Sequence, residues 1–401
     1  MEITNTGICV EGFKAYGTRK GKYGISLIVS DVPTTSSVMI TSNRVIAAPL
    51  LLTTKHSKTR NLQGAVANSG CANAFTGDEG LSDAKEMQIF ASNELGINPK
   101  YLGVASTGVI GQRLDMNLIR SLIQETSKEM KNNNDASIAA SKAIMTTDSN
   151  HKSISVKTRL KSGKVIEIGG IAKGTGMIAP DLHHATMLCF LTTNAYIPKE
   201  KIDKILKEAV NQSFNVSTVD GDTSTNDMVI LFANGHAKNV DIDANFQEAL
   251  DFVTCELAKM LVRDAEGGTK LIEIRVLNAK DKVDALKAGR AIASSNLVKT
   301  ALFGENPNWG RIIAAAGYSG AIFNPSDISL SLSGGDIESS LVEGGKIRAS
   351  KGSDELERAK HLLKNKEVKI ILNLNNGRKN ATLYGCDMGY DYIKINAEYS
   401  T

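Results

Sequence analysis

The sequence predicts an α+β fold of layered sheets and helices. Runs rich in β-branched residues and bounded by turn-forming residues are interspersed with segments of helical periodicity. The two kinds of segment do not alternate strictly, which favours α+β over a doubly wound parallel sheet. The 401 residues are enough to bury a large core, and no repeat or proline-rich linker marks a domain boundary.

The expected elements follow from these patterns. Strands are expected at residues 23–31, 64–70, 227–235, 270–277, 368–374 and 391–399. Helices are expected at residues 82–95, 115–132, 198–214, 243–267 and 282–304. Ser82 and Asp115 stand where the first two helices need N-caps, and Pro198 occupies a first-turn position of the third.

Composition limits the partners and the compartment. The net charge is only +4 and the charges are mixed along the chain, so no nucleic-acid partner is expected. Residues 12–24 interleave basic and aromatic side chains, which suits phosphate contacts and equally suits a solvated glycine-rich loop. No apolar stretch reaches the roughly 20 residues that span a bilayer, and the first residues do not resemble a signal peptide. We expect a soluble, cytoplasmic protein without a membrane partner.

Metal and nucleotide sites are not expected. The five cysteines form no CxxC pair, which disfavours a disulfide framework or a zinc cage. His183 and His184 are neighbours, and on a strand they would point to opposite faces. The segment DGDTSTND at 220–227 has Thr225 where a calcium loop needs glycine and is followed by Leu231 where the loop needs glutamate. No cofactor is therefore predicted.

Thr186 lies at the start of the apolar run ATMLCFLTTNA. One interpretation is a buried strand over 187–191 with Thr186 as its half-exposed first residue. The other is a nucleophile, because a threonine at a chain N-terminus can pass its hydroxyl proton to its own α-amine. The pKa of such an amine is about 7.7–8.0, close to neutral pH. Ala185 is small, so Thr186 Oγ has room to attack the preceding peptide carbonyl and cut the chain there.

Thr107 and Gly108 form a candidate oxyanion hole within YLGVASTGVIGQRLD at 101–115. Acyl-transfer chemistry needs hydrogen-bond donors fixed where negative charge develops on the tetrahedral intermediate. A threonine hydroxyl and a glycine amide in a turn of small residues supply such donors. Turns of this composition are common between strands and helices, so the motif alone leaves a structural role open.

Several segments, taken together, resemble one family. They are NSGCANAFTGDEGLSDA (68–84), STGVIG (106–111), AIMTTD (143–148), GGIAKGTGMIAP (169–180), ATMLCFLTTNA (185–195), SFNVSTVDGDTSTND (213–227), LVKTALFGENPNWGRIIAAAG (297–317) and GCDMGYDYIKINAEYST (385–401). In this order they are similar to the ornithine acetyltransferases, or glutamate N-acetyltransferases, of arginine biosynthesis. The match runs nearly end to end, which makes it far more specific than any single motif.

The resemblance implies a layered αββα fold that cuts itself between Ala185 and Thr186. The products would be chains of residues 1–185 and 186–401, which would remain together as a heterotetramer with two copies of each. Thr186 would be the nucleophile, with Thr107 and Gly108 as the oxyanion hole. The implied substrate contacts are Thr147, preferred to Thr146, together with Lys173, Thr186, Glu266, Asn396 and Thr401.

These residue types suit the implied ligands. The carboxylate of an N-acetylated amino acid matches the ammonium of Lys173 and the polar groups of Thr147, Asn396 and Thr401, and Glu266 matches the side-chain amine of ornithine. The implied reaction is ping-pong: N-acetylornithine acetylates Thr186 and ornithine leaves, and glutamate then takes the acetyl group as N-acetylglutamate. Some members of the family also use acetyl-CoA, and the sequence leaves this open.

Two alternatives remain at this point. An N-terminal-nucleophile hydrolase shares the cleavage chemistry but passes the acyl group to water. A scaffold that keeps the fold without processing is the other alternative, because APDLHHATM has two more residues between the proline and the threonine than the family usually has.

Overall fold

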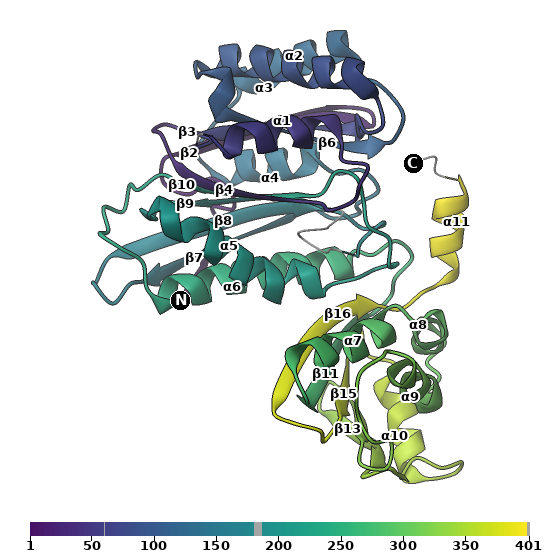
Figure 1. Cartoon of the computed structure of the whole chain (residues 1–401). Helices are drawn as coiled ribbons and strands as arrows, with labels where there is room; N and C mark the ends of the chain where they lie inside the picture. Colours follow the sequence, from purple (N-terminus) through teal and green to yellow (C-terminus); the bar gives the residue numbers. More distant parts are fainter. Residues whose placement is uncertain (60, 180–186, 399–401) are drawn as a thin grey trace. The chain divides into compact units, whose positions relative to one another are not determined.

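The computed structural model describes residues 1–59, 61–179 and 187–398 (Figure 1). These residues form two compact units. The first unit comprises residues 1–215 and 222–261, and the second comprises 216–221 and 262–398. Ala185, Thr186 and Thr401, like His183 and His184, lie outside the described residues.

The first unit contains two sheets. The strands of the larger sheet are β1 (Glu2–Thr4), β4 (Thr35–Ile40), β7 (Lys152–Arg159), β8 (Val165–Lys173), β9 (Leu188–Thr193) and β10 (Met228–Ala233). The strands of the smaller sheet are β2 (Phe13–Lys20), β3 (Tyr23–Ser30), β5 (Gly64–Cys71) and β6 (Leu102–Val109). The order is β1-β7-β8-β9-β10-β4 in the larger sheet and β2-β3-β5-β6 in the smaller.

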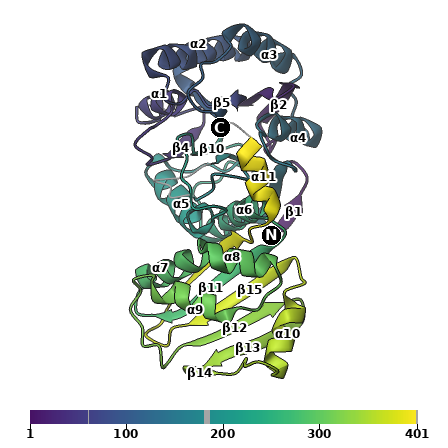
Figure 2. The same cartoon turned by 90° about the vertical axis from the view of Figure 1, so that its right-hand side faces the viewer.

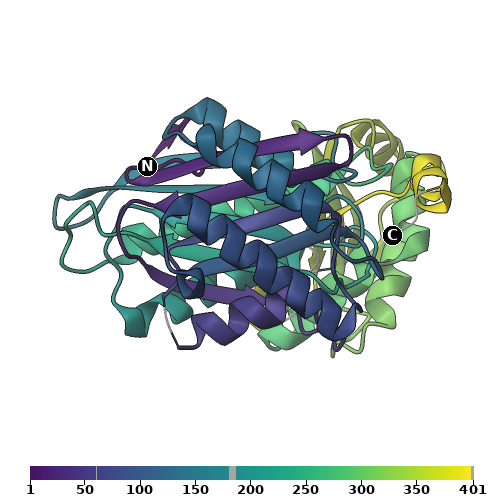
Figure 3. The ribbon, with the colours of Figure 1, turned by 90° about the horizontal axis from the view of Figure 1, so that it is seen from above.

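Helices cover the outer faces of both sheets, which confirms the predicted αββα layering. The helices of this unit are α1 (Ala48–Ser57), α2 (Gly77–Leu95), α3 (Met116–Lys128), α4 (Asn134–Ala143), α5 (Lys199–Gln212) and α6 (Ala244–Arg263). One apolar cluster joins α2 and α3 to the smaller sheet, and another joins α5 and α6 to the larger sheet. Figure 1 shows the layers edge-on, and Figure 3 shows α2 and α3 from above, lying across the strands beneath them.

Strand β10 shows why the layers form. Successive side chains of a strand point to opposite faces, so a strand buried on both faces must be apolar at every position. Met228, Ile230 and Phe232 pack in the cluster between the two sheets. Val229 and Leu231 pack on the opposite face, in the cluster that contains α5 and α6. The run MVILFA therefore serves two cores at once.

The second unit is one sheet with helices. Its strands are β11 (Leu271–Ala279), β12 (Ser329–Gly334), β13 (Ile337–Glu343), β14 (Lys346–Ile347), β15 (Glu367–Asn373) and β16 (Lys379–Cys386), in the order β14-β13-β12-β15-β11-β16. Its helices are α7 (Lys282–Ala293), α8 (Asn296–Phe303), α9 (Trp309–Gly317), α10 (Asp354–Leu362) and α11 (Tyr390–Glu398). Helix α7 packs on β11 and β16, and α10 packs on β12 and β13 (Figure 2).

The strand predicted at 391–399 is wrong, because residues 390–398 form α11. A strand needs a neighbouring strand to satisfy its backbone groups, whereas a helix satisfies most of its own. The helix has Asp391 in its first turn, where a negative charge is favourable. The apolar residues Tyr390 and Ile393 are exposed within this unit, so no buried face imposed the two-residue period of a strand.

Helix boundaries also differ from the expectations. The Asp115 cap is confirmed, since its carboxylate accepts hydrogen bonds from the amides of Asn117 and Leu118. The Ser82 cap is wrong, because α2 begins five residues earlier and carries Asp78 and Glu79 in its first turn. The single helix predicted at 282–304 is divided into α7 and α8. Its second part begins where the Ser295 hydroxyl accepts a hydrogen bond from the amide of Val298, as an N-cap does.

Strands β8 and β9 flank the predicted cleavage junction. They are hydrogen-bonded neighbours in antiparallel register, with Lys173 opposite Leu188. The segment between them contains residues 180–186, so both sides of the junction enter the same sheet. Among the described residues, no helix is long and apolar enough to cross a lipid bilayer.

Candidate active site

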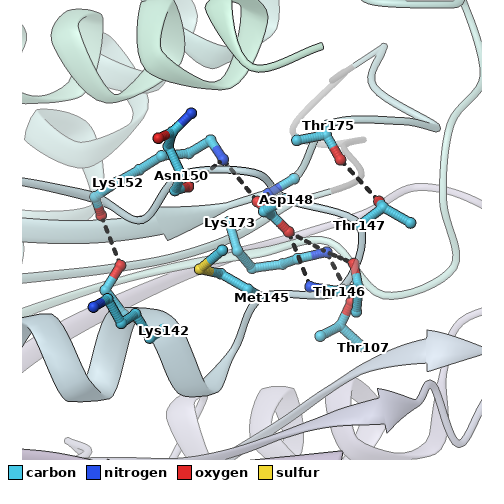
Figure 4. A network of polar contacts seen from close by, with 12 residues as sticks. Thr107, Lys142, Met145, Thr146, Thr147, Asp148, Asn150, Lys152, Lys173 and Thr175 are labelled. Carbon is cyan, nitrogen blue, oxygen red and sulfur yellow. Dashed lines mark hydrogen bonds and ion pairs between the residues drawn. The ribbon is translucent and has the colours of Figure 1, made fainter. Parts of the chain in front are cut away.

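A buried charge cluster lies where β7 and β8 meet the chain that follows α4 (Figure 4). The carboxylate of Asp148 accepts a hydrogen bond of 2.7 Å from Lys152 Nζ and another of 2.7 Å from the amide of Gly174. It also accepts one of 3.0 Å from the amide of Thr146. The Nζ atom of Lys173 lies 3.8 Å from Asp148 Oδ2, the same oxygen that accepts from the Thr146 amide. One carboxylate thus connects two strands and the preceding loop.

The charge state of Asp148 follows from these contacts. Burial by itself would raise the pKa of its carboxyl, but the charges of Lys173 and Lys152 and the hydrogen bonds lower the pKa to about 2. The side chains of Asp148 and Lys152 are almost wholly buried. The stabilisation by the carboxylate is therefore complete above the ordinary pKa of about 4 and is lost only as the pH falls towards 2.

Lys173 connects this cluster to the predicted oxyanion hole. Its Nζ atom donates to Thr146 Oγ1 at 2.8 Å and to Thr107 Oγ1 at 3.2 Å. Thr107 and Gly108 are near the end of β6 in the smaller sheet, and Lys173 is the last residue of β8 in the larger sheet. Two residues that were predicted for different roles therefore lie in direct contact between the two sheets.

Thr147, the preferred substrate contact, makes a different interaction. Its Oγ1 atom lies 2.9 Å from Thr175 Oγ1, whereas Thr146 contacts Lys173. Figure 4 shows Thr147 beside Thr175 and Thr146 beside the ammonium of Lys173. Both hydroxyls belong to the same polar network, and the preference for Thr147 as a substrate contact stays a prediction.

Gly108 has a conformation that requires glycine. Its φ of +131° is one that residues with a side chain rarely adopt. A Cβ atom built there would lie 2.3 Å from the backbone carbon of Gly70 and 2.5 Å from the nitrogen of Cys71. Strand β5 is irregular at this point, with Cys71 opposite both Thr107 and Val109. The backbone at the candidate oxyanion hole is therefore set by close approach of two strands.

Glu266 and Asn396, the other described residues among the predicted substrate contacts, belong to the second unit. The amide Nδ2 of Asn396 donates to Glu266 Oε2 at 2.9 Å and to the carbonyl of Tyr392 at 2.9 Å. Helix α11 thus brings together two residues that are 130 positions apart in the sequence. Ala185, Thr186 and Thr401 lie outside the described residues.

The sequence interpretation did not identify Asp148 or Lys152. Asp148 ends the AIMTTD segment, and Lys152 follows four residues later as the first residue of β7. An aspartate followed four residues later by a lysine is common on protein surfaces. The pattern therefore does not indicate that the two side chains are buried. Among the described residues, no three His, Cys, Asp or Glu side chains are grouped as a metal site would require.

Comparison with known proteins identifies the family. A sequence model of the ArgJ family matches residues 10–401. The chain belongs to the ArgJ family. A relative named glutamate N-acetyltransferase, from Methanocaldococcus jannaschii, is 46% identical over 405 residues that cover 100% of both chains. The arginine biosynthesis bifunctional protein ArgJ of Symbiobacterium thermophilum is 45% identical over 391 residues, covering 96% of this chain and 94% of the relative.

A solved structure of this family is also similar. The crystal structure of the arginine biosynthesis bifunctional protein ArgJ from Bacillus halodurans is 40% identical, covering 52% of this chain and 97% of that chain, with a TM-score of 0.48. The full-length relatives of this ArgJ-family chain carry acyltransferase names, and the chain is an acyltransferase.

Removing the Asp148 carboxylate is expected to destabilise the protein. Asp148→Asn leaves the charge of Lys152 buried without its partner, and breaking a buried pair in this way costs about 3–5 kcal/mol. Thermal unfolding at neutral pH measures the loss. Glu125→Gln is the control, since Glu125 pairs with Lys20 on the surface and its replacement should scarcely change the melting temperature. Equal effects of the two substitutions would contradict the importance of the buried pair.

Gly108→Ala is expected to lower both stability and turnover. The unfavourable φ costs about 1–3 kcal/mol, and the contact with the Gly70 backbone adds to it. The matched control is Gly111→Ala, where φ is +79° but no atom lies within 4 Å of the added Cβ. The free energy of unfolding and the initial rate are measured for both variants. The difference between them separates the cost of the unfavourable φ from the cost of the contact between the added Cβ and the Gly70 backbone. A Gly108→Ala enzyme as stable and active as the Gly111→Ala enzyme would contradict the close-approach explanation.

Proposed function

We propose that the protein transfers an acetyl group from N-acetylornithine to glutamate through an acetyl ester on Thr186. The proposal is supported by the family and by full-length relatives named glutamate N-acetyltransferase. The observation that carries it is the contact between Lys173 and Thr107, with Gly108 beside it. Lys173 pairs with Leu188 across β8 and β9, and Leu188 is two residues after Thr186. The candidate oxyanion hole is thereby close to the chain that follows the nucleophile.

The first step is self-cleavage. Thr186 Oγ attacks the carbonyl carbon of Ala185, the acyl group moves from nitrogen to oxygen, and water hydrolyses the resulting ester. The two products, residues 1–185 and 186–401, stay associated because β8 belongs to one and β9 to the other, and these strands are hydrogen-bonded along their length. Further assembly into a heterotetramer of two copies of each chain is part of the same proposal.

The second step is acetyl transfer. The free α-amine of Thr186 takes the hydroxyl proton while Oγ attacks the acetyl carbonyl of N-acetylornithine. Thr107 and the amide of Gly108 stabilise the oxyanion, the bond to the ornithine nitrogen breaks, and the amine returns the proton to the leaving group. Glutamate then attacks the ester in the same way and leaves as N-acetylglutamate. No metal or nucleotide takes part in this sequence of steps.

The proposed substrate contacts are polar or charged residues. Lys173 is the buried cation of the first unit that lies against Thr107, and Thr147 and Thr146 place hydroxyls in the same network. These groups suit the carboxylate of an amino-acid substrate. In the second unit, Glu266 accepts a hydrogen bond from Asn396 and suits the side-chain amine of ornithine. Asn396 and Thr401 belong to the set predicted for the substrate carboxylate.

Cleavage is tested by intact mass and denaturing electrophoresis. We expect the wild-type chain of 42.9 kDa to give two fragments that divide between Ala185 and Thr186. Thr186→Ala should remain a single chain and make no N-acetylglutamate, because it lacks the hydroxyl that cuts and carries the acetyl group. His183→Ala is the control and should be cut and active. Loss of turnover in a folded His183→Ala enzyme would contradict the assignment of the α-amine as the base.

Transfer is distinguished from hydrolysis by product analysis. With N-acetylornithine and glutamate, N-acetylglutamate should form in a one-to-one ratio with ornithine. Without glutamate, sustained ornithine release should fall by at least about tenfold, since the acetyl ester then waits for water. An undiminished rate of ornithine release, with acetate as the co-product, would identify an N-terminal-nucleophile hydrolase instead. Supplying acetyl-CoA in place of N-acetylornithine determines whether the enzyme has one acetyl donor or two.

A further inference from the structure

Asp227 is a buried carboxyl group that the mechanism above does not use. It is the residue immediately before β10, and its exposed fraction is only 1%. Neither of its carboxyl oxygens makes a hydrogen bond with a described residue. Its backbone, by contrast, is held firmly, because its carbonyl accepts a hydrogen bond of 2.9 Å from the amide of Thr41. The backbone of Asp227 is thus held in place, while its carboxyl group has no hydrogen-bond partner among the described residues.

Such a group is costly in a folded protein. Burying a polar group without a hydrogen bond costs about 1–3 kcal/mol, and a charged group costs more. Asp148, in the same unit, has Lys152 and two backbone amides as hydrogen-bond donors. A buried carboxyl group with no hydrogen-bond donor among the described residues therefore needs an explanation, and a partner created after folding would supply one.

The place of Asp227 indicates where that partner arises. Met228 is opposite Leu188 in the parallel pairing of β10 with β9, and its amide donates to the carbonyl of Met187 at 2.8 Å. Asp227 therefore lies beside Met187, the residue that follows Thr186. The amides of Met187 and Ser224 are near enough to lower the pKa of the carboxyl, although neither makes a hydrogen bond of ordinary geometry with it.

Cleavage changes the chemistry next to Met187. In the uncut chain the nitrogen of Thr186 belongs to a peptide bond and carries no charge. After hydrolysis the same nitrogen is an amine, which binds a proton and then offers three donors. This amine is one residue away from the Met187 backbone that adjoins Asp227.

We propose that Asp227 is a positioning residue whose carboxylate accepts a hydrogen bond from the α-amine of Thr186 once the chain is cut. The inference rests on the proposed self-cleavage. During acylation the proton of Thr186 Oγ moves to the α-amine, the resulting ammonium pairs with the Asp227 carboxylate, and the proton then passes to the departing amine of ornithine. Asp227 itself makes no contact with substrate in this scheme.

The charges predict a direction for the pH dependence. Burial raises the pKa of Asp227 well above its ordinary value, and the Met187 amide and the charge of Lys173 oppose this rise. An ammonium beside the carboxyl favours its ionised form, and the carboxylate in turn raises the pKa of the amine, typically by one unit or more. The amine accepts the hydroxyl proton only when it is neutral, so activity should increase with pH through the amine pKa.

The test is the pH profile of Asp227→Asn, with intact mass as the first measurement. We expect the variant to be cut, because the amine that Asp227 binds does not exist until cleavage is complete. The acidic limb of the kcat/KM profile should move to lower pH by about one unit, since the amine loses its carboxylate. The maximal kcat should fall about tenfold, because the ammonium formed in the reaction is less stabilised, while KM for N-acetylornithine changes little.

Asp251→Asn is the matched control. Asp251 lies on α6, burial also raises the pKa of its carboxyl, and Gln247 donates to it at 2.7 Å. Its replacement should leave the profile at the wild-type position. A cut Asp227→Asn enzyme with a wild-type profile would overturn the proposal. An uncut Asp227→Asn chain would also overturn it, because the carboxyl would then act before the amine exists.

The melting temperature provides a second test if the Asp227→Asn enzyme folds too poorly for kinetic measurements. In the uncut Thr186→Ala chain, Asp227→Asn should leave the melting temperature unchanged or raise it, since it removes an unpartnered carboxyl. In the cut enzyme the same substitution should lower the melting temperature by about 2–4 °C, because it removes a charged partner. Equal shifts in both backgrounds, or failure to fold in the Thr186→Ala background, would contradict the proposal. An uncut wild-type chain would overturn the proposed function and this inference together, whereas a normal profile in cut Asp227→Asn overturns the inference alone.

Discussion

The candidate site depends on one buried carboxylate. Asp148 holds the ammonium of Lys152 at 2.7 Å, attracts that of Lys173 and binds the backbone amides of Thr146 and Gly174. Without it, two lysines would be buried with their charges uncompensated, at a cost of several kcal/mol for each ion. With it, Lys173 is fixed at the end of β8 with its Nζ atom against Thr107. Among the described residues, Lys173 is the only cation that is hydrogen-bonded to Thr107. Its position is thus set by Asp148, a residue with no assigned role in catalysis.

The larger sheet supplies the second constraint. Strands β9 and β10 are buried at every position and β8 is buried from Ile168 onwards, so most of their side chains are apolar. Lys173 ends β8, and Asp227 immediately precedes β10. The antiparallel pairing of β8 with β9 and the parallel pairing of β9 with β10 bring these two ends to the start of β9. Chemistry at this edge of the sheet needs no cavity within the core.

Asp148 and Asp227, two buried aspartates of this unit, illustrate different uses of a charge. Asp148 is saturated with donors, and its pKa is lowered to about 2, which suits a permanent structural anion. Asp227 lacks hydrogen-bond donors among the described residues, and burial raises its pKa, which suits a group whose partner appears later. In the proposed self-cleavage, the uncut chain folds before the catalytic amine exists. A carboxyl group without a hydrogen-bond donor among the described residues, next to the proposed cleavage site, is compatible with folding before cleavage.

The sequence by itself determined the α+β class, most of the buried strands and the family, because hydrophobic period and the order of eight motifs are properties of the chain. It also singled out Thr107, Gly108 and Lys173. Only the tertiary structure decided that Lys173 contacts Thr107, since these residues are 66 positions apart and meet through the stacking of two sheets. Likewise, the pattern at 391–399 matched a strand, whereas the described residues Tyr390–Glu398 form a helix. Burial distinguishes Asp148 and Asp227 from surface carboxylates, and burial is a property of packing that local sequence does not contain.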